Sequence, residues 1–433
     1  MTMKSLLSRR SFGFGFGAAV GLAATARAQA PSTRAAILSS GAPPWVPRSG
    51  GVPAAIHADF FNGRYWGAGR ATPSFESWLA SLGGSFTSGP KWYQSNAAGL
   101  WTKENRSNVP VFDHDANGKR GLVIEQGTTL KGNGKRDLTH VDWVKTDCTA
   151  AKDQVGADGV AGAASSLTAT GAGATCLQSI TSGSVNTITA ALVKRLVGVG
   201  VVEMTQDNGA TWTPIVPTAA YLTFGCPFQV LVNPIVGFRL ATSGDAIAVD
   251  FARVAQAGTL QMPSSPTDVD GSFDRTLDTL SIPVPCPGWS ATAGSFVVEL
   301  YPNSTNALGI MAASDGSNAN RIQLGQNTAA TQVLGTVTDG AATQANMTTA
   351  GTAGVGPGVG ALYKCAMAWA ANSFATVLGG STVTADVAGT VPSAITMLRF
   401  GAVGSGITGS ASFKAFSYFP FRVSNAELQR LTT

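Results

Sequence analysis

Charge and histidine are scarce in this sequence of 433 residues. Asp, Glu, Lys and Arg make up 12% of the chain, about half the share that is typical of soluble proteins. The three histidines are His57, His114 and His140, whereas the two strand-rich segments described below begin at residues 141 and 285. Neither segment therefore contains a histidine, which excludes Ser-His-Asp catalysis, Cys-His catalysis and histidine metal ligation from both.

Paired acids, paired cysteines and long apolar runs are also missing. Sandwich-type glycosidases need two carboxylates that flank the scissile bond, but no E-x-D-x-E arrangement occurs here. The glutamates are isolated: Glu76, Glu104, Glu125, Glu203, Glu299 and Glu427. The cysteines form no CxxC pair and fit no zinc site: they are Cys148, Cys176, Cys226, Cys286 and Cys365. No uncharged apolar run reaches the roughly 20 residues of a membrane helix. The sequence predicts no enzyme, no cofactor, no metal site and no membrane span.

Glycine and other turn-forming residues are abundant instead. The chain has 52 glycines, much Ala, Ser, Thr and Val, and turn residues at short intervals. This mixture is typical of many short strands joined by tight turns, and it predicts an all-β fold with two β-sandwiches after a short mixed N-terminal region. Helical spacing predicts short helices only at "PSFESWLASLGG" and at the final "SNAELQRLTT". The predicted divisions are an arm or signal at 1–30, an N-terminal attachment region at 31–140, a first sandwich at 141–257, a connector at 258–284 and a second sandwich at 285–433.

The first 30 residues resemble a bacterial twin-arginine export signal. They combine Arg9 and Arg10, a weakly apolar Gly/Ala stretch and a small-x-small end at Ala30. The alternative is an uncleaved arm. The segment holds four basic residues and no acid, so its removal lowers the formal charge from +5 to +1. A nearly neutral mature chain has no electrostatic footprint for nucleic acid. In an exported chain one disulfide, Cys148 to Cys176, is conceivable, with the remaining cysteines as buried thiols.

The stretch "DHDANG" at 113–118 has the spacing of the first half of a calcium loop. A helix-loop-helix calcium site needs a bidentate glutamate at position 12, where this chain has Ile124. Lys119 and Arg120 would also repel the cation. Asp and Asn side chains that bond their own backbone, together with Gly118, explain the cluster better as a tight turn between two strands. The stretch therefore predicts a hairpin.

The same stretch carries a family resemblance. "NVPVFDHDANGKRGLVIEQGTTL" resembles the "N-x-PRFDYDP-x-TGE-x-RGLLIEE-x-RTNL" segment of tailed-phage and prophage virion proteins. "DWVKTDCTAAKDQVGADGVAGAASSLTATG" and "VDFARVAQAGTLQMPSSPTDVDGSFDRTLDTLSIP" resemble the start and exit of the carbohydrate-binding-like jelly roll that follows in them. Residues 290–433 resemble their C-terminal concanavalin A-like (laminin-G-like) sandwich, including "SFKAFSYFPFRVSNAELQRLT". Gly127-Thr128-Thr129 replaces the family's "RTN".

Sugar recognition needs flat aromatic faces beside amide and carboxylate partners. The predicted hairpin tip "SDGSNANRIQ" offers such polar groups, and two aromatic residues lie on a nearby strand pattern. The candidate carbohydrate-binding residues are Asp315, Asn318, Asn320, Arg321, Tyr363 and Trp369. The alternative interpretation makes the tip a solvated turn and the two aromatic residues part of the core.

The resemblance implies a non-enzymatic virion surface protein, such as a tail fibre, head fibre or spike. Such a protein would attach to other virion proteins through its N-terminal region, bind host cell-surface glycans through its sandwiches, and form a homotrimer. The signal-like N-terminus supports an alternative, a lectin-like protein exported to the periplasm or the medium by the twin-arginine route. A polysaccharide-degrading enzyme is the third hypothesis.

Overall fold

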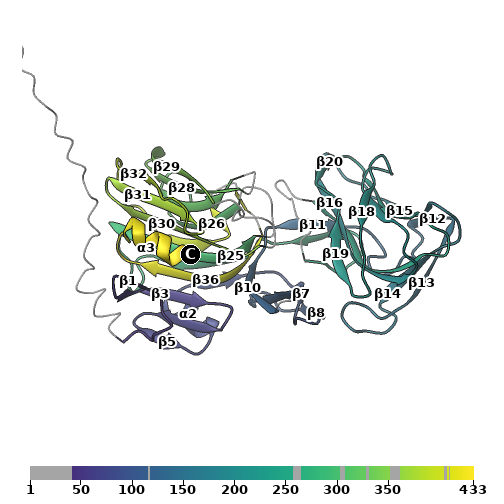
Figure 1. The fold of residues 1–433 in the computed structure, drawn as a ribbon, viewed down its shortest axis with the longest axis horizontal. Helices are drawn as coiled ribbons and strands as arrows, with labels where there is room; N and C mark the ends of the chain where they lie inside the picture. Colours follow the sequence, from purple (N-terminus) through teal and green to yellow (C-terminus); the bar gives the residue numbers. More distant parts are fainter. Residues whose placement is uncertain are drawn as a thin grey trace, which may run out of the picture.

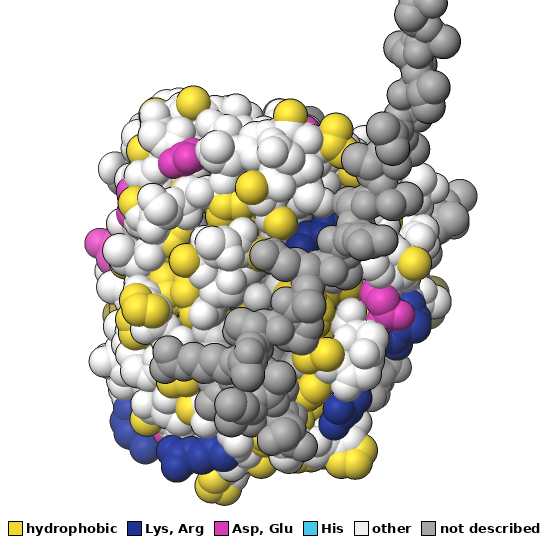
Figure 2. Space-filling view, turned by 90° about the vertical axis from the view of Figure 1, so that its left-hand side faces the viewer, with side chains coloured by type: hydrophobic (Ala, Val, Ile, Leu, Met, Phe, Trp, Pro, Cys, Tyr) yellow, Lys and Arg dark blue, Asp and Glu magenta, His cyan; other side chains and the backbone are white. Residues whose placement is uncertain are grey.

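The computed structural model describes residues 41–115, 118–256, 265–302, 308–327, 331–351, 361–403, 407–408 and 410–433. The predicted signal at 1–30 and the start of the predicted connector lie outside these residues. Figure 1 shows two β-rich lobes side by side, with the C-terminus in one of them. Figure 2 shows the end of this lobe that faces away from the other lobe, where charged side chains are few. We call this one the C-terminal lobe (described residues of 41–87, 112–124 and 279–433) and the other the central lobe (128–256 and 273–275). The predicted fold class, all-β with two β-sandwiches, is confirmed.

The C-terminal lobe consists of two facing antiparallel sheets. Among the described residues, the larger sheet has ten strands, in the order β32 (Thr384–Asp386), β31 (Ser373–Leu378), β30 (Tyr363–Ala370), β25 (Ala293–Pro302), β36 (Ala411–Phe419), β3 (Ile56–Asp59), β4 (Arg64–Gly67) and β5 (Arg70–Thr72), with β10 (Gly118–Ile124) paired to β36 and to β9 (Phe112–Asp115). The smaller sheet has, in the same part of the chain, the order β29 (Ala342–Ala350), β28 (Gln332–Asp339), β27 (Arg321–Gln326), β26 (Leu308–Ser314), β33 (Met397–Phe400), β24 (Thr279–Pro283) and β6 (Ser85–Thr87).

Both faces of the larger sheet are buried. Its inner face packs against the smaller sheet through an aromatic core that includes Phe296, Trp369 and Phe416. Its outer face is covered by residues 42–54 and by helix α3 (Asn425–Thr432), which bury a second apolar cluster. Helix α2 (Phe75–Ser81) packs its apolar side into the main core. The central strands of this sheet are therefore apolar on both sides, as is typical of a sheet that is covered on each face.

The described residues of the predicted attachment region at 31–140, namely 41–115 and 118–140, do not form a separate region, which corrects the predicted division. Strand β3 pairs with β36, so Ala58 lies opposite Phe416 across more than 350 positions of sequence. Strand β6 likewise extends the smaller sheet by pairing with β24. The sequence pattern missed these pairings because strand alternation shows which residues are buried and not which distant strand they pair with.

The central lobe is a second sandwich. Its larger sheet, eight-stranded in the described residues, has the order β13 (Cys148–Gln154), β14 (Ala164–Ala169), β22 (Ala246–Gln256), β11 (Thr128–Lys131) and β23 (Phe273–Arg275), with β16 (Val185–Val197) paired to β22 and also to β19 (Leu222–Gly225) and β20 (Gln229–Leu231). The facing sheet, five-stranded in the same residues, has the order β12 (Trp143–Thr146), β15 (Ala174–Ser179), β21 (Ile235–Leu240), β17 (Val202–Thr205) and β18 (Thr213–Ile215). Trp143, Phe238 and Val249 belong to the core between them.

Short two-stranded ribbons complete the described structure: β1 (Arg48–Ser49) with β2 (Val52–Pro53), β7 (Lys91–Gln94) with β8 (Trp101–Glu104), and β34 (Ala402–Val403) with β35 (Ile407–Thr408). The ribbon of β7 and β8 links the lobes, because Trp92 packs on Leu192 and Phe251 of the central lobe. No helix of the described residues is long and apolar enough to cross a membrane.

Local turn predictions fare well in one case and fail in another. The "DHDANG" stretch is a hairpin, as predicted, since Asp115 of β9 pairs with Gly118 of β10. The stretch "GFRLATSGDAIAVDFARVAQAG" predicts a second strand pair that turns at residues 243–245. This prediction is wrong, because β21 and β22 lie in different sheets and the turn carries the chain across the sandwich. All five cysteines are thiols, so the disulfide from Cys148 to Cys176 is not formed.

The two lobes meet at a group of buried charged side chains, which we call the junction cluster: Lys91, Glu125, Arg253, Arg275 and Asp278. Arg275 Nη1 lies 2.9 Å from Glu125 Oε2, and the Lys91 ammonium contacts the Asp278 carboxylate. The cluster lies where the chain crosses between lobes, from β10 to β11 and from β23 back to β24. Buried charges are tolerated only when paired, so this network fixes how the two crossings lie together.

Candidate functional site

The predicted sugar-binding tip joins β26 to β27, and its polar groups bond one another. Asp315 Oδ1 accepts hydrogen bonds from the Ser317 backbone N–H at 2.8 Å and from the Ser317 hydroxyl at 2.7 Å. Its Oδ2 accepts from Asn320 Nδ2 at 2.8 Å. These bonds lower the pKa of Asp315, the largest cause being the Ser317 hydroxyl. The aspartate thus caps its own turn.

The other two tip residues are similarly engaged. Arg321 Nη1 donates to Asn318 Oδ1 at 2.7 Å, and burial lowers the pKa of Arg321. Asn320 Oδ1 accepts from the Gly340 backbone N–H at 2.9 Å, which ties the tip to the neighbouring turn. The structure therefore brings Asp315, Asn318, Asn320 and Arg321 together at an exposed turn whose polar groups stabilise the turn itself.

Tyr363 and Trp369 do not join this tip, which corrects their prediction as sugar-binding residues. Both lie on β30 with exposed fractions of 2% and 0%. Trp369 packs its ring 4.6 Å from the ring of Phe296, and Tyr363 donates to Gln326 Oε1 at 3.2 Å inside the core. A sugar cannot reach either ring, so the alternative interpretation, in which the aromatic residues are core, describes the structure.

Two buried carboxylates, Glu125 and Asp278, come together in the junction cluster. Burial alone would raise the pKa of Glu125, but Arg275 and Lys91, with hydrogen bonds from Ser265, outweigh burial and lower it. Burial raises the pKa of Asp278 despite the opposing charge of Lys91. The two side chains are 6% and 0% exposed, which leaves no room for a substrate. In the described part of the chain, no group of three His, Cys, Asp or Glu residues could hold a metal ion.

The outer face of the five-stranded sheet presents an aromatic ring that was not among the predicted site residues. Trp212 follows the β17–β18 turn, and the Arg239 guanidinium of β21 lies 4.4 Å from the centre of its ring. Arg239 Nε donates to Glu203 Oε2 of β17 at 2.6 Å. Strand register places Glu203 opposite Arg239, and Thr175 on the other side of Arg239. We call these four residues, Thr175, Glu203, Trp212 and Arg239, the Trp212 face.

The Trp212 face points away from the core because strand side chains alternate. Val202 and Met204 of β17, and Phe238 and Leu240 of β21, belong to the core, so the residues between them face outward. The sequence contained this signal as the alternation of β17, Val-Glu-Met-Thr, followed by "DNGATW". It was missed because the tryptophan follows the turn and is not itself part of the alternating pattern.

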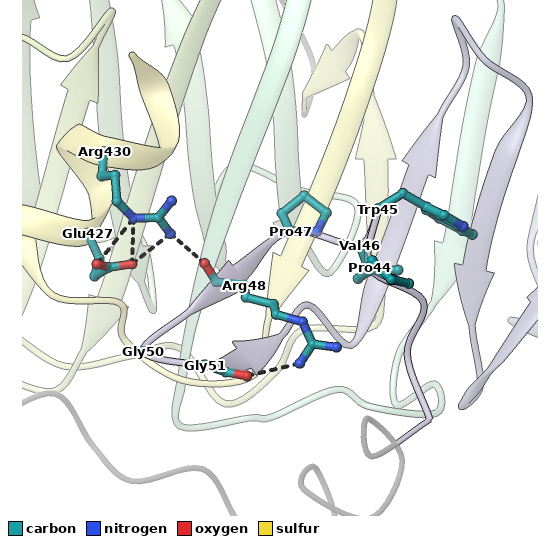
Figure 3. Close-up of a pocket in the computed structure, with 9 residues that line it drawn as sticks. All are labelled: Pro44, Trp45, Val46, Pro47, Arg48, Gly50, Gly51, Glu427 and Arg430. Atoms are coloured by element: carbon teal, nitrogen blue, oxygen red, sulfur yellow. Dashed lines mark hydrogen bonds and ion pairs between the residues drawn. The ribbon is translucent and has the colours of Figure 1, made fainter.

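A concave surface lies in the C-terminal lobe, between the β1–β2 ribbon and helix α3 (Figure 3). It is a shallow, open depression of about 420 Å³, lined by Pro44, Trp45, Val46, Pro47, Arg48, Gly50, Gly51, Glu427 and Arg430. We call it the Trp45 hollow. Its volume falls in the range of small-molecule sites, about 300–1,000 Å³. A smaller apolar cavity of about 170 Å³ lies beside Trp289 and Ile395.

Comparison with known proteins yields only loose similarity. No family model matches the chain, and no curated protein does either. Among solved structures, the carbohydrate-binding module (CBM40) of the Ruminococcus gnavus IT-sialidase, bound to α2,3-sialyllactose, is 14% identical, with coverage of 33% of this chain and 84% of the module and a TM-score of 0.27. The LG4-5 domains of the mouse laminin α1 chain are 10% identical, with coverage of 54% and 83% and a TM-score of 0.23. Overlaps this loose do not assign a function.

Proposed function

We propose that this protein is a non-enzymatic glycan-binding protein that holds sugars on the Trp212 face of its central lobe. The observation that carries the proposal is the placement of Trp212 beside the Arg239–Glu203 pair on the outer side of a sheet. An indole offers an apolar surface to the C–H groups of a pyranose ring. The guanidinium donates and the carboxylate accepts hydrogen bonds, so together they match sugar hydroxyls, which do both.

The biological setting we propose is the surface of a phage or prophage particle. This part rests on the ordered sequence resemblance to virion proteins and includes attachment to other virion proteins and a homotrimeric assembly. Mass spectrometry of purified particles from an induced producer strain tests it, and absence of the chain from them would contradict it. The alternative is a lectin-like protein exported by the twin-arginine route, motivated by "SRRSF" and "ARAQA". It predicts that N-terminal sequencing of the accumulated protein begins at Pro31.

A glycan array with the full chain tests the sugar-binding proposal. Wild type should bind at least one class of glycan, and Trp212→Ala should weaken that binding about tenfold or more because a stacking surface is lost. Phe61→Ala is the matched control, since Phe61 is a 37% exposed aromatic residue of the other lobe. It should bind like wild type.

Asp315→Ala tests the hairpin tip in the same array. Loss of binding in this variant, with Trp212→Ala unchanged, would move the site to the tip. Failure of wild type to bind any glycan on the array would overturn glycan binding altogether.

A further inference from the structure

The Trp45 hollow combines a fixed positive charge with an aromatic wall. Arg48 comes from β1, donating from Nη1 to the Gly51 carbonyl and from Nη2 to the Ala42 carbonyl, both at 3.0 Å. These two acceptors are neutral. They use two of the five N–H groups of the guanidinium and hold its plane in one position.

The other arginine of the hollow is already neutralised. Arg430 Nη2 lies 2.8 Å from Glu427 Oε2, one turn earlier on α3, and the same nitrogen donates to the Arg48 backbone carbonyl at 2.5 Å. Glu427 also accepts from the backbone of the Gly50 turn, and its pKa is lowered chiefly by Arg430. The charged residues that line the hollow are Arg48, Arg430 and Glu427. Because Glu427 neutralises Arg430, the net positive charge of the hollow is that of Arg48.

The wall beside Arg48 is flat and apolar. Trp45 is half-buried against the apolar layer under α3, with its ring 5.9 Å from that of His57, and Pro44 and Pro47 flank it. Figure 3 shows the Glu427–Arg430 pair on one side of Arg48 and Trp45 on the other. A saccharide of several units that lies across the hollow would therefore have Arg48 at its middle, Glu427 on one side and Trp45 on the other.

We propose that the Trp45 hollow is a second binding site, for a sugar unit that carries a carboxylate. The carboxylate would accept two hydrogen bonds from the outward N–H groups of Arg48, the pairing that guanidinium geometry favours. Neighbouring units of the same saccharide would reach Trp45 on one side of Arg48 and donate a hydroxyl hydrogen bond to Glu427 on the other. This proposal rests on the proposed glycan-binding function and deepens it, because it names acidic saccharides as one ligand class and gives them a site apart from the Trp212 face.

Calorimetric titration of the full chain with trigalacturonate tests the proposal, with the methyl-esterified trisaccharide as the uncharged counterpart. Trigalacturonate should bind, and its ester should bind at least about tenfold more weakly because the charged hydrogen bonds are lost. Binding should also weaken as salt is added.

Three variants locate the site. Arg48→Gln should weaken trigalacturonate binding about tenfold or more, whereas Arg64→Gln, at an exposed arginine of β4 outside the hollow, should not. Glu427→Gln should strengthen binding about threefold because the net charge of the hollow rises by one. A variant with a misfolded β1–β2 ribbon would not bind trigalacturonate more tightly. The result for Glu427→Gln therefore tests the proposal even if Arg48→Gln folds poorly.

Each remaining outcome overturns a different statement. Equal binding of the acid and its ester, or an unchanged affinity in both hollow variants, would overturn the acidic-sugar site alone. Inorganic phosphate competing as well as trigalacturonate would show a general anion site rather than a sugar site. If Trp212→Ala abolishes the binding of all glycans, trigalacturonate included, the Trp212 face remains the proposed glycan site. The proposed acidic-sugar site in the Trp45 hollow is then wrong. If no glycan of any class binds wild type, the proposed function itself fails.

Discussion

Replacing Lys91 by methionine should destabilise the junction between the two lobes severely. Lys91 is 3% exposed, its ammonium contacts the Asp278 carboxylate, and it lies 3.8 Å from Glu125 Oε2. Methionine has a similar length and volume, so the variant removes the charge and leaves the packing nearly unchanged. Asp278, which is 0% exposed, would keep the hydrogen bond from the Glu125 backbone N–H at 2.9 Å but no cation in contact.

The expected loss follows from the cost of leaving one buried charge without its partner. Removing one member of a buried ion pair costs about 3–5 kcal/mol of unfolding free energy. For a unit of about 150–250 residues, each kcal/mol lowers Tm by about 2–4 °C. Scanning calorimetry at neutral pH should therefore show a Tm for Lys91→Met that is about 10 °C below that of wild type.

The loss should shrink in acid. Burial raises the pKa of Asp278, and Lys91 opposes that rise. Without Lys91, Asp278 would protonate at a higher pH in the fold than in the unfolded chain. A group whose pKa is raised on folding favours the folded state at low pH and loses that contribution as pH rises through its folded pKa. The Tm difference between wild type and Lys91→Met should therefore be larger at about pH 8 than at about pH 5.

A double variant separates the charge from other effects. Asn at position 278 can still accept from the Glu125 N–H, so Lys91→Met with Asp278→Asn removes the pair while keeping that hydrogen bond. The double variant should recover more than about half of the lost stability, since replacing both partners costs less than removing one. A Tm loss below about 2 °C in Lys91→Met, or no recovery in the double variant, would refute the reasoning.

Two further predictions concern the C-terminal lobe. Burial lowers the pKa of His57 to about 4, so its folded form favours the neutral imidazole; the stability it supports is present above about pH 6.5 and falls by about 3 kcal/mol as pH drops to about 4. In His57→Gln, the free energy of unfolding measured with urea should change by about 3 kcal/mol less than in wild type between about pH 6.5 and about pH 4. An unchanged pH dependence would contradict the lowered pKa of His57. Gly121 has φ +141°, and a Cβ there would lie 2.0 Å from the Phe413 carbonyl oxygen, so Gly121→Ala should cost more than about 2 kcal/mol. Gly183→Ala, where a Cβ meets open space, should change the unfolding free energy by less than about 0.5 kcal/mol, and similar losses in both variants would contradict the close approach.

The parts of the fold that depend on neighbouring residues could be predicted from the sequence. Helix α2 begins after Ser74, whose side chain accepts from the Ser77 N–H, as expected of an N-cap. In "SFKAFSYF", Phe413 and Phe416 lie three positions apart and cannot share one face of a regular strand, which predicts a bulge. Strand β36 does shift register against β25, between Glu299 and Leu300. The pairing of β3 with β36, and the separation of β21 from β22 into two sheets, depend on distant segments and could not be predicted from local pattern.

The wrong site residues have a related physical cause. In a sandwich with one solvated side, alternate residues of a strand face water, and an aromatic residue there is a candidate contact for a ligand. Strand β30 has no such side, because the smaller sheet covers its inner face and α3 with residues 42–54 covers its outer face. Trp369 therefore lies in the core, whereas Trp212 lies in the loop before β18 and packs against Arg239 on the outer face of the five-stranded sheet.

The segments that resemble virion proteins supply every member of the junction cluster except Lys91. Glu125 comes from "GLVIEQ", and Arg275 and Asp278 come from "FDRTLD"; all three are buried where the chain crosses between the lobes. Gly127, which stands where the family has arginine, faces the same crossing, since a Cβ there would lie 3.4 Å from the Arg275 carbonyl oxygen. These motif residues therefore explain how the two sandwiches are joined and carry no information about a ligand. Specificity has to come from exposed residues outside the quoted motifs, and Trp212 and Arg48 both meet that condition.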